Sequence, residues 1–193
     1  MNQWWQFWPQ HFCAKDCDEI IRMAKTFPVV EGSVGHGANR NIIDTTIRRS
    51  QLRWLPRFDH QFYALFGIMK TLFAEANRNA FGFDVTEFHE VQFTEYNADN
   101  VGHYTWHHDT MWTSNKLFRR KLSMVIQLSD PSDYEGGQLE LAEDECHEVP
   151  NAAEIKQRGT VIVFPSFLRH RVTPVTKGRR YSLVSWMEGP FFR

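Results

Sequence analysis

The chain has 193 residues, 42% of them hydrophobic, and 22 Lys and Arg residues against 23 Asp and Glu give a formal net charge of −1. This length suits a single hydrophobic core, and the hydrophobic fraction excludes a disordered chain. The near-zero charge provides no general attraction for nucleic acid or for an anionic membrane surface. No run of about 18 apolar residues is present to span a bilayer. We therefore expect one domain over residues 1–193, with neither nucleic acid nor a membrane as its partner.

The cysteines and the first residues of the chain indicate the compartment. Three cysteines occur, Cys13, Cys17 and Cys146, a small odd number that argues against a disulfide framework and for a reducing environment. Residues 1–12 contain no basic region and no small-residue cleavage site of a signal peptide. We expect a cytoplasmic protein, or one in the host cytoplasm if the source is a virus.

Aromatic and helical patterns fill the first half of the chain. The crowded rings Trp4, Trp5, Phe7 and Trp8 indicate either a terminus packed on the body of the protein or an interaction site for a partner. One apolar helix face, ending before Pro28, is predicted from Cys13, Cys17, Ile20, Ile21 and Ala24. A longer amphipathic helix, ended by residues 77–82, is predicted from Phe58, Phe62, Leu65, Phe66, Met69, Leu72, Phe73 and Ala76. Between the two helices we expect a flexible glycine-containing loop over residues 32–39.

From about residue 87 the pattern changes to short β-rich runs separated by turns. They cover residues 87–96, 104–108, 121–128, 137–141, 160–165, 170–172 and 180–186. Short strands at this spacing are typical of a sandwich or jelly roll rather than a parallel α/β sheet. The expected fold class is α+β, mainly β. A double-stranded β-helix (jelly roll) core over about 86–193 is braced from outside by the helices of a helical and loop part, about 1–85.

A His-x-Asp tripeptide marks the candidate metal site. Residues i and i+2 of a strand share a face, so His107 and Asp109 are expected to point together into the barrel while His108 points away. An imidazole and a carboxylate need one more histidine to form a facial triad, which leaves positions open on iron(II). The tripeptide alone is weak evidence, because a histidine on a strand is more often structural.

The candidate third ligand and a candidate anion site lie further along the chain. His170 follows an apolar strand and a short turn, and opens the next strand, which can return it to the metal. Arg180 and Ser182 alternate onto one strand face, and a guanidinium beside a hydroxyl suits a carboxylate. The alternative reading of Arg180 is an exposed strand residue like Arg179.

Four segments resemble the prolyl-4-hydroxylase-type 2-oxoglutarate and iron(II)-dependent dioxygenases. They are residues 96–109, 121–128, 133–141 and 164–186, in family order and at family-like spacing. The last is the most specific, because a proline precedes His170, His-x-Val-x-Pro-Val-Thr begins at that residue, and Gly-x-Arg-Tyr-Ser-Leu comes next. The first 80 residues match only loosely.

The resemblance implies roles for individual residues. His107, Asp109 and His170 would bind iron(II), and Arg180 would pair with the distal carboxylate of 2-oxoglutarate. Tyr96 would hydrogen-bond the same co-substrate, although its spacing to the first histidine varies by a residue in the family. Other residues implied in the pocket are Gln127, Ser182, Leu139 and Trp186. The glutamine stands where relatives often carry a tyrosine, which puts that contact in doubt.

The resemblance also implies the reaction and its partners. Oxygen and 2-oxoglutarate would give succinate and carbon dioxide while a substrate C–H bond is hydroxylated, with ascorbate as the reductant in assays. We expect the substrate to be a prolyl residue in a peptide or protein. The alternatives are a free amino acid, a small metabolite or a nucleobase, and a non-catalytic jelly-roll binding module. The expected substrate-facing segments are residues 32–44 and 110–117, and further candidate surface residues are Trp106, Trp112 and Arg119 or Arg120. The oligomeric state is not predicted.

Overall fold

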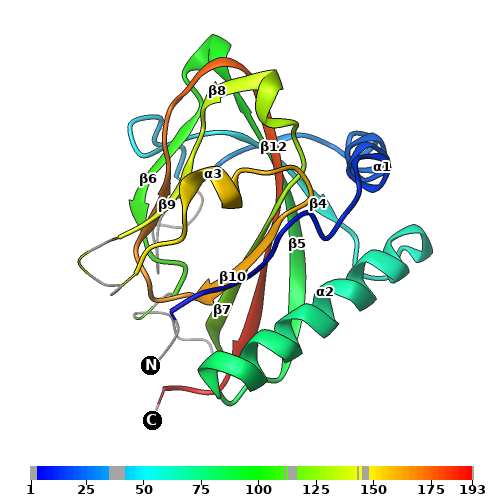
Figure 1. Ribbon diagram of the computed structural model, residues 1–193, viewed down its shortest axis with the longest axis vertical. Helices are drawn as coiled ribbons and strands as arrows, with labels where there is room; N and C mark the ends of the chain where they lie inside the picture. Colours follow the sequence, from blue (N-terminus) through cyan, green and yellow to red (C-terminus); the bar gives the residue numbers. More distant parts are fainter. Residues whose placement is uncertain are drawn as a thin grey trace.

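Two facing β-sheets with helices on the outside of the larger sheet make up the described part of the chain (Figure 1). The computed structural model describes residues 4–34, 42–110, 112, 117–142, 144 and 148–192. This arrangement confirms the predicted α+β jelly roll braced by helices. None of the described helices is long and apolar enough to cross a membrane.

The larger sheet has eight antiparallel strands in the order β1-β10-β7-β12-β5-β4-β2, with β8 added beside β12. Its strands are β1 (Gln6–Trp8), β2 (Val30–Glu31), β4 (Gln51–Leu55), β5 (Glu87–Asn97), β7 (Arg119–Gln127), β8 (Tyr134–Gly136), β10 (Val161–Pro165) and β12 (Val175–Gly189). The long strand β12 lies between β7 and β5. Side chains alternate along it, so Arg180 and Ser182 face the smaller sheet while Leu183 joins the core under the helices.

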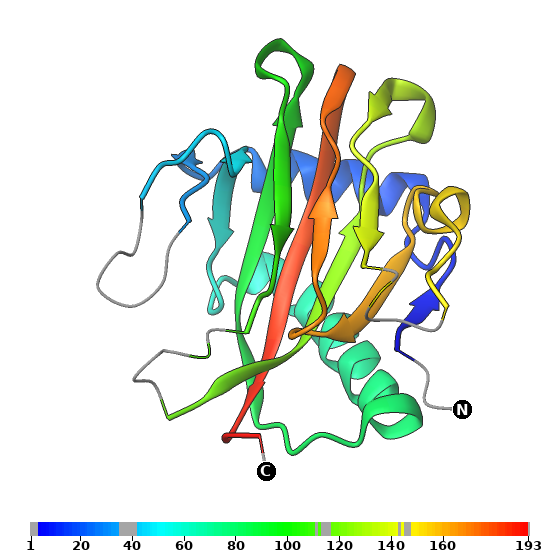
Figure 2. The same ribbon diagram turned by 90° about the vertical axis from the view of Figure 1, so that its left-hand side faces the viewer.

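The smaller sheet has the order β3-β6-β11-β9 and lies across the larger one (Figure 2). Its strands are β3 (Arg48–Arg49), β6 (His103–His107), β9 (Leu139–Leu141) and β11 (His170–Val172). His170 pairs with His107, and Val172 pairs with Tyr104, so β6 carries one residue more than β11 between these pairs. This bulge turns Tyr104 and His107 to the same side, where their rings stack at 3.5 Å between centroids.

The helices follow the predicted apolar faces except at Cys13, which was wrongly assigned to the first face and is exposed before that helix begins, and at Phe58. The helical segments are α1 (Ala14–Ala24), η1 (His60–Phe62), α2 (Tyr63–Ala76), η2 (Asn77–Phe81), η3 (Ala98–Asn100), η4 (Pro131–Asp133) and α3 (Ala152–Ile155). Phe58 was wrongly assigned to the second helix face: it is 82% exposed, because Asp59 caps the helical segment by accepting from the Gln61 amide. At the other end the helix continues as a π turn to Phe81 and stops at the left-handed Gly82.

Apolar packing lies mainly between the helices and the outer face of the larger sheet. Fully buried members of this cluster include Met69 and Phe73 of α2, Phe93 of β5 and Leu183 of β12. Two smaller clusters join the sheets to each other. One contains Val125, Leu139, Leu141, Ile155, Ile162, Phe164 and Leu168, and the other contains Tyr96, Tyr134, Val172 and Val175. The buried polar side chains include Asp109, Gln127, His170 and Arg180.

The first 55 residues contribute strands that the sequence did not predict. β1 pairs with β10, and the ring of Trp4 meets Phe167 edge-to-face at 6.5 Å, so the aromatic N-terminus is packed on the body of the protein. Cys17 of α1 is buried, and Cys13, the residue before α1, is exposed, both as free thiols. Cys146 and most of the glycine loop, residues 35–41, lie outside the described residues.

Replacement of Phe73 by alanine should lower the free energy of unfolding by about 3–5 kcal/mol, because the ring is fully buried between α2 and the sheet. Phe58→Ala removes the same ring from an 82% exposed position. It should change the free energy of unfolding by less than about 0.5 kcal/mol. Urea unfolding followed by circular dichroism measures both, and equal losses would contradict this placement of the core.

Candidate active site

One group of side chains in the described part of the chain could hold a metal ion: His107, Asp109 and His170, whose ligand atoms all lie within 4.8 Å of one another. The Nε2 atom of His170 lies 3.4 Å from Asp109 Oδ2, and Nε2 of His107 lies 3.9 Å from Asp109 Oδ1. His107 ends β6, Asp109 follows two residues later, and His170 opens the neighbouring β11. Strand pairing therefore brings His170 to His107 and Asp109, which lie far from it in the sequence.

Backbone carbonyls orient both imidazoles. Nδ1 of His107 lies 2.7 Å from the Thr105 carbonyl, and Nδ1 of His170 lies 3.0 Å from the Leu168 carbonyl. A carbonyl only accepts, so each ring carries a proton on Nδ1, and its Nε2 is the nitrogen that faces Asp109. This arrangement is typical of histidines that ligate metal.

The protonation of the group also suits a cation. Burial, together with the neighbouring His170, lowers the pKa of His107 to about 3, so this ring is neutral. Burial by itself raises the pKa of Asp109, but the adjacent His170, with His107, holds the pKa of this carboxyl well below its usual range. Neutral imidazole and ionised carboxylate are the forms that bind a metal. The donor set thus fits an iron(II) ion in a 2-His-1-carboxylate site.

The residues that flank Asp109 are held by the turn after β10. The backbone amides of Asp109 and Thr110 both donate to the Ser166 carbonyl, at 2.9 and 3.0 Å. His108 turns away from the group, as expected from alternation, and its Nδ1 lies 2.5 Å from the Phe167 carbonyl. The turn that leads to His170 therefore also fixes the segment that carries the carboxylate.

A buried guanidinium lies between the same two sheets. Arg180 is 1% exposed, and it donates from Nη2 to Gln127 Oε1 at 2.8 Å and from Nη1 to Ser182 Oγ at 3.3 Å. The ring of Tyr96 lies 5.4 Å from its central carbon. Its Nε has no partner, and no carboxylate of the described residues pairs with it. A buried charge without a counter-ion is costly, so this pocket suits an anionic ligand.

Arg179 contrasts with its neighbour. Its side chain is 53% exposed and pairs with Glu95 at 3.5 Å on the outer face of the sheet. The structure thus separates the two arginines as the alternation predicted, and the reading of Arg180 as an exposed strand residue is wrong.

Two further residues shape the arginine pocket and were missed in the sequence. Tyr134 of β8 is 3% exposed, and its phenol hydrogen-bonds Arg180. Burial raises the pKa of Tyr134 against the opposing effect of that cation, so the phenol keeps its proton. Gly137 is needed beside them, since a Cβ on its left-handed backbone would lie 3.0 Å from Arg180 Cδ. The sequence offered no signal for the phenol, because the β8–β12 pairing that delivers it is not a local pattern.

A stacked pair beside the metal group was also missed. The ring of Tyr104 lies flat on that of His107. The Arg48 guanidinium lies 4.6 Å from the centre of the Tyr104 ring. Burial raises the pKa of Tyr104 to about 12, so it stays neutral. The pair depends on the bulge in β6, which period-two alternation does not predict.

Trp186 is a buried residue that packs against a cation and a second indole. The Arg120 guanidinium lies 3.6 Å from the centre of the Trp186 ring and pairs with Glu90 at 3.3 Å. The half-exposed Trp54 lies 6.4 Å from the same ring. Leu139 packs with the cluster that contains Phe164, whose ring meets His170 at 4.8 Å. These are apolar and cationic side chains around a buried polar centre.

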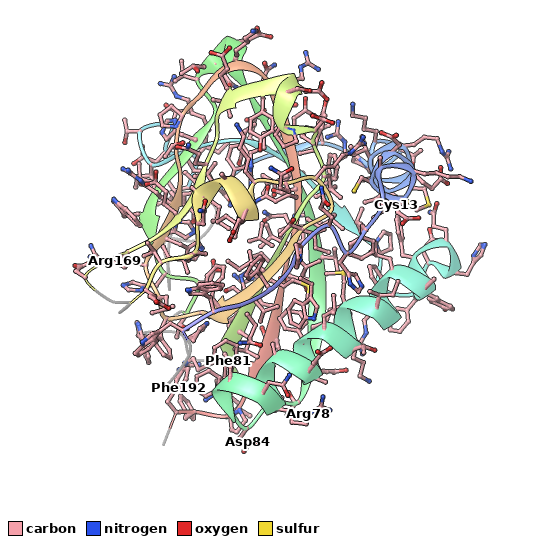
Figure 3. All side chains as sticks on the ribbon, in the orientation of Figure 1. Cys13, Arg78, Phe81, Asp84, Arg169 and Phe192 are labelled. Atoms are coloured by element: carbon pink, nitrogen blue, oxygen red, sulfur yellow. The ribbon has the colours of Figure 1, made fainter. Side chains whose placement is uncertain are left out.

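Other aromatic candidates lie elsewhere. Trp106 borders a separate groove of about 810 Å³ together with Arg169, which stands at the edge of the molecule in Figure 3. Trp112 meets Phe192 at 5.5 Å, at the end of the molecule where Figure 3 labels that residue. Arg119 lies 4.4 Å from the ring of Phe191. Residues 111 and 113–116 of the expected substrate-facing segment are outside the described residues.

Comparisons with solved structures agree with this fold. A prolyl-4-hydroxylase from Pseudomonas putida superposes with a TM-score of 0.70 at 22% identity, covering 95% of this chain and 92% of that one. A prolyl hydroxylase from Trichoplax adhaerens, in complex with a hypoxia inducible factor oxygen degradation domain peptide, gives a TM-score of 0.74 at 17% identity, covering 95% and 83%.

Sequence comparisons give the family. A PKHD-type hydroxylase from Synechococcus sp. is 37% identical over 78 residues, which are 40% of this chain and 33% of that protein. Another from Gloeothece citriformis is 35% identical over 104 residues, 53% of this chain and 44% of that protein. The chain thus spans less than half the length of these curated relatives. The model of the 2OG-Fe(II) oxygenase superfamily matches residues 91–188, just over half of the 193 residues. The chain belongs to the 2OG-Fe(II) oxygenase superfamily.

Proposed function

We propose that the chain is a 2-oxoglutarate- and iron(II)-dependent dioxygenase that hydroxylates a substrate C–H bond, and that residues 1–193 form one such domain. The observation that carries the proposal is a buried 2-His-1-carboxylate group between the same sheets as a buried arginine without an anionic partner. Bound iron(II), with 2-oxoglutarate and oxygen, supplies the oxidising chemistry. A non-catalytic binding module would have no need of both features.

The side chains of the pocket divide the work between metal and co-substrate. His107, Asp109 and His170 would hold the iron(II) ion through one ligand atom each. Arg180 orients the distal carboxylate of 2-oxoglutarate through its fork of N–H donors. The pocket also has hydroxyl, amide and phenol groups available for the same anion, from Tyr96, Gln127, Tyr134 and Ser182. Burial of the whole set keeps water from the reacting atoms.

We propose a prolyl residue in a peptide or protein as the substrate. Two structural relatives are named as prolyl hydroxylases, and one of them is in complex with a peptide. In this chain Trp54, Trp186 and Arg120 lie together and combine flat apolar rings with a cation. Such a group suits a proline ring flanked by peptide carbonyls. A free amino acid, a small metabolite or a nucleobase is the alternative class.

We also propose a cytoplasmic location and ascorbate as the assay reductant. Cys13 and Cys17 are free thiols, which suits a reducing compartment. Ascorbate would keep the metal in its iron(II) state between turnovers.

Alanine in place of His107, Asp109 or His170 should abolish iron binding and the conversion of 2-oxoglutarate to succinate, because each residue supplies one ligand atom. His108→Ala is the matched control, since its ring bonds the Phe167 carbonyl and faces away from the group. Iron content and succinate release measure the effect. Full activity in His107→Ala with loss in His108→Ala would reverse the assignment.

Arg180→Lys should raise the KM for 2-oxoglutarate about ten- to hundredfold with little change in fold, because a lysine cannot form the bidentate contact. Arg179→Lys changes the neighbouring arginine on the outer face and should leave the KM unchanged. Succinate release at varied 2-oxoglutarate concentration gives both constants. Equal effects at the two positions would contradict the assignment of the anion pocket.

A proline-rich peptide should stimulate succinate release above the uncoupled background, in the presence of iron, ascorbate and 2-oxoglutarate, and should gain the mass of an oxygen atom. Free proline and a single-stranded oligonucleotide are the comparison substrates, and neither should do so. Stimulation by free proline or the oligonucleotide without any by the peptide would overturn the peptide assignment. It would leave the dioxygenase assignment intact.

A further inference from the structure

Two serine hydroxyls lie behind the carboxylate of Asp109. Ser123 of β7 donates from Oγ to Asp109 Oδ2 at 2.6 Å, and Ser166 Oγ lies 2.9 Å from Ser123 Oγ. Neither serine has exposed surface. A hydroxyl has a single hydrogen, and that of Ser123 goes to the ionised carboxylate, so Ser166 must donate to Ser123. The hydrogen bonds therefore run in one direction, from Ser166 through Ser123 to Asp109.

We call the hydrogen-bonded chain Ser166–Ser123–Asp109 the relay. Ser166 also fixes the backbone on both sides of it. Its carbonyl accepts from the amides of Asp109 and Thr110, and its own amide donates to the Lys121 carbonyl at 2.9 Å. One residue thus ties the main chain of Asp109 to strand β7 and at the same time bonds the hydroxyl that holds the carboxylate.

The relay makes the two carboxylate oxygens unequal. Oδ2 takes the hydrogen bond from Ser123, whereas no hydrogen bond from the described residues reaches Oδ1. A charge-assisted bond of this length holds the plane of the carboxylate and occupies a lone pair of Oδ2. Donation from Ser166 polarises the Ser123 hydroxyl and strengthens its bond to Asp109.

A buried serine without a role at the metal site can satisfy its hydroxyl with a backbone carbonyl, as one serine of the larger sheet does. Ser185 of β12 is equally buried, and its hydroxyl donates to the Glu90 carbonyl at 2.8 Å. Ser123 and Ser166 instead bond each other and a candidate metal ligand. Hydrogen-bond partners of ligating carboxylates commonly tune metal affinity.

We propose that Ser123 and Ser166 are positioning residues of the metal centre, which hold Asp109 so that Oδ1 is the oxygen available to the metal. Ser123 acts on the carboxylate directly, and Ser166 acts through Ser123. The inference rests on the proposed function only in that His107, Asp109 and His170 must bind a metal.

The test is a titration of metal-free protein with manganese(II) alone, with the free ion counted by electron paramagnetic resonance. Ser123→Ala should weaken the manganese Kd about ten- to hundredfold, and Ser166→Ala should weaken it by less, about three- to tenfold. The double variant should match Ser123→Ala alone, because Ser166 has no other route to the carboxylate oxygen. Ser185→Ala, the matched buried serine, should leave the Kd unchanged.

Melting temperatures with and without manganese separate positioning from general stability. The metal-free melting temperatures of the Ser123, Ser166 and Ser185 variants should fall by similar small amounts. The rise caused by manganese should shrink only for the Ser123 and Ser166 variants. An unchanged Kd in Ser123→Ala, or effects of the two relay substitutions that simply add, would overturn the relay. A wild-type protein that binds no manganese would instead overturn the metal site, and with it the proposed function.

Discussion

Hydrogen bonds to the turn between β10 and β11 fix two of the three candidate metal ligands, Asp109 and His170. The Ser166 carbonyl accepts from the Asp109 amide. The next two carbonyls, of Phe167 and Leu168, lie at hydrogen-bond distance from Nδ1 of His108 and Nδ1 of His170. β10 belongs to the larger sheet and β11 to the smaller one, so the turn closes one end of the sandwich. The ligand geometry is therefore a direct consequence of how the two sheets are joined, and a shift of either sheet would move the ligands.

Several buried polar and charged side chains lie between the sheets, whereas the largest apolar cluster lies under the helices. A buried arginine without an anion and three closely spaced ligands are unfavourable in a folded interior. The apolar cluster under α1 and α2, on the opposite face of the larger sheet, offsets that cost. Alternate side chains of β12 point to opposite faces of the sheet, so this strand contributes Leu183 to the apolar cluster and Arg180 to the candidate site. The helices thus support the pocket without contributing a residue to it.

Alternation along single strands could be read from the sequence, and long-range pairing could not. The separation of Arg180 from Arg179, and of His107 from His108, follows from the period of two. The bulge that turns Tyr104 onto its neighbour depends on a register between β6 and β11, and the strands before residue 55 are mostly too short to show a period. The misplaced Phe58 has a local cause instead. Phe58 has the spacing of the helix face, but the helical segment begins only after the cap at Asp59, so Phe58 lies outside it.

The departure of this chain from its family at position 127 has a structural counterpart. The glutamine gives Arg180 an acceptor oxygen at 2.8 Å, at a position where the family resemblance implied a tyrosine. A phenol nevertheless reaches the same guanidinium, from Tyr134 on β8, a strand that pairs with the first residues of β12. Burial keeps this phenol protonated and thus able to donate to an anion. The pairing of a guanidinium with a neutral hydroxyl donor is therefore retained in the pocket, although a different strand supplies the hydroxyl.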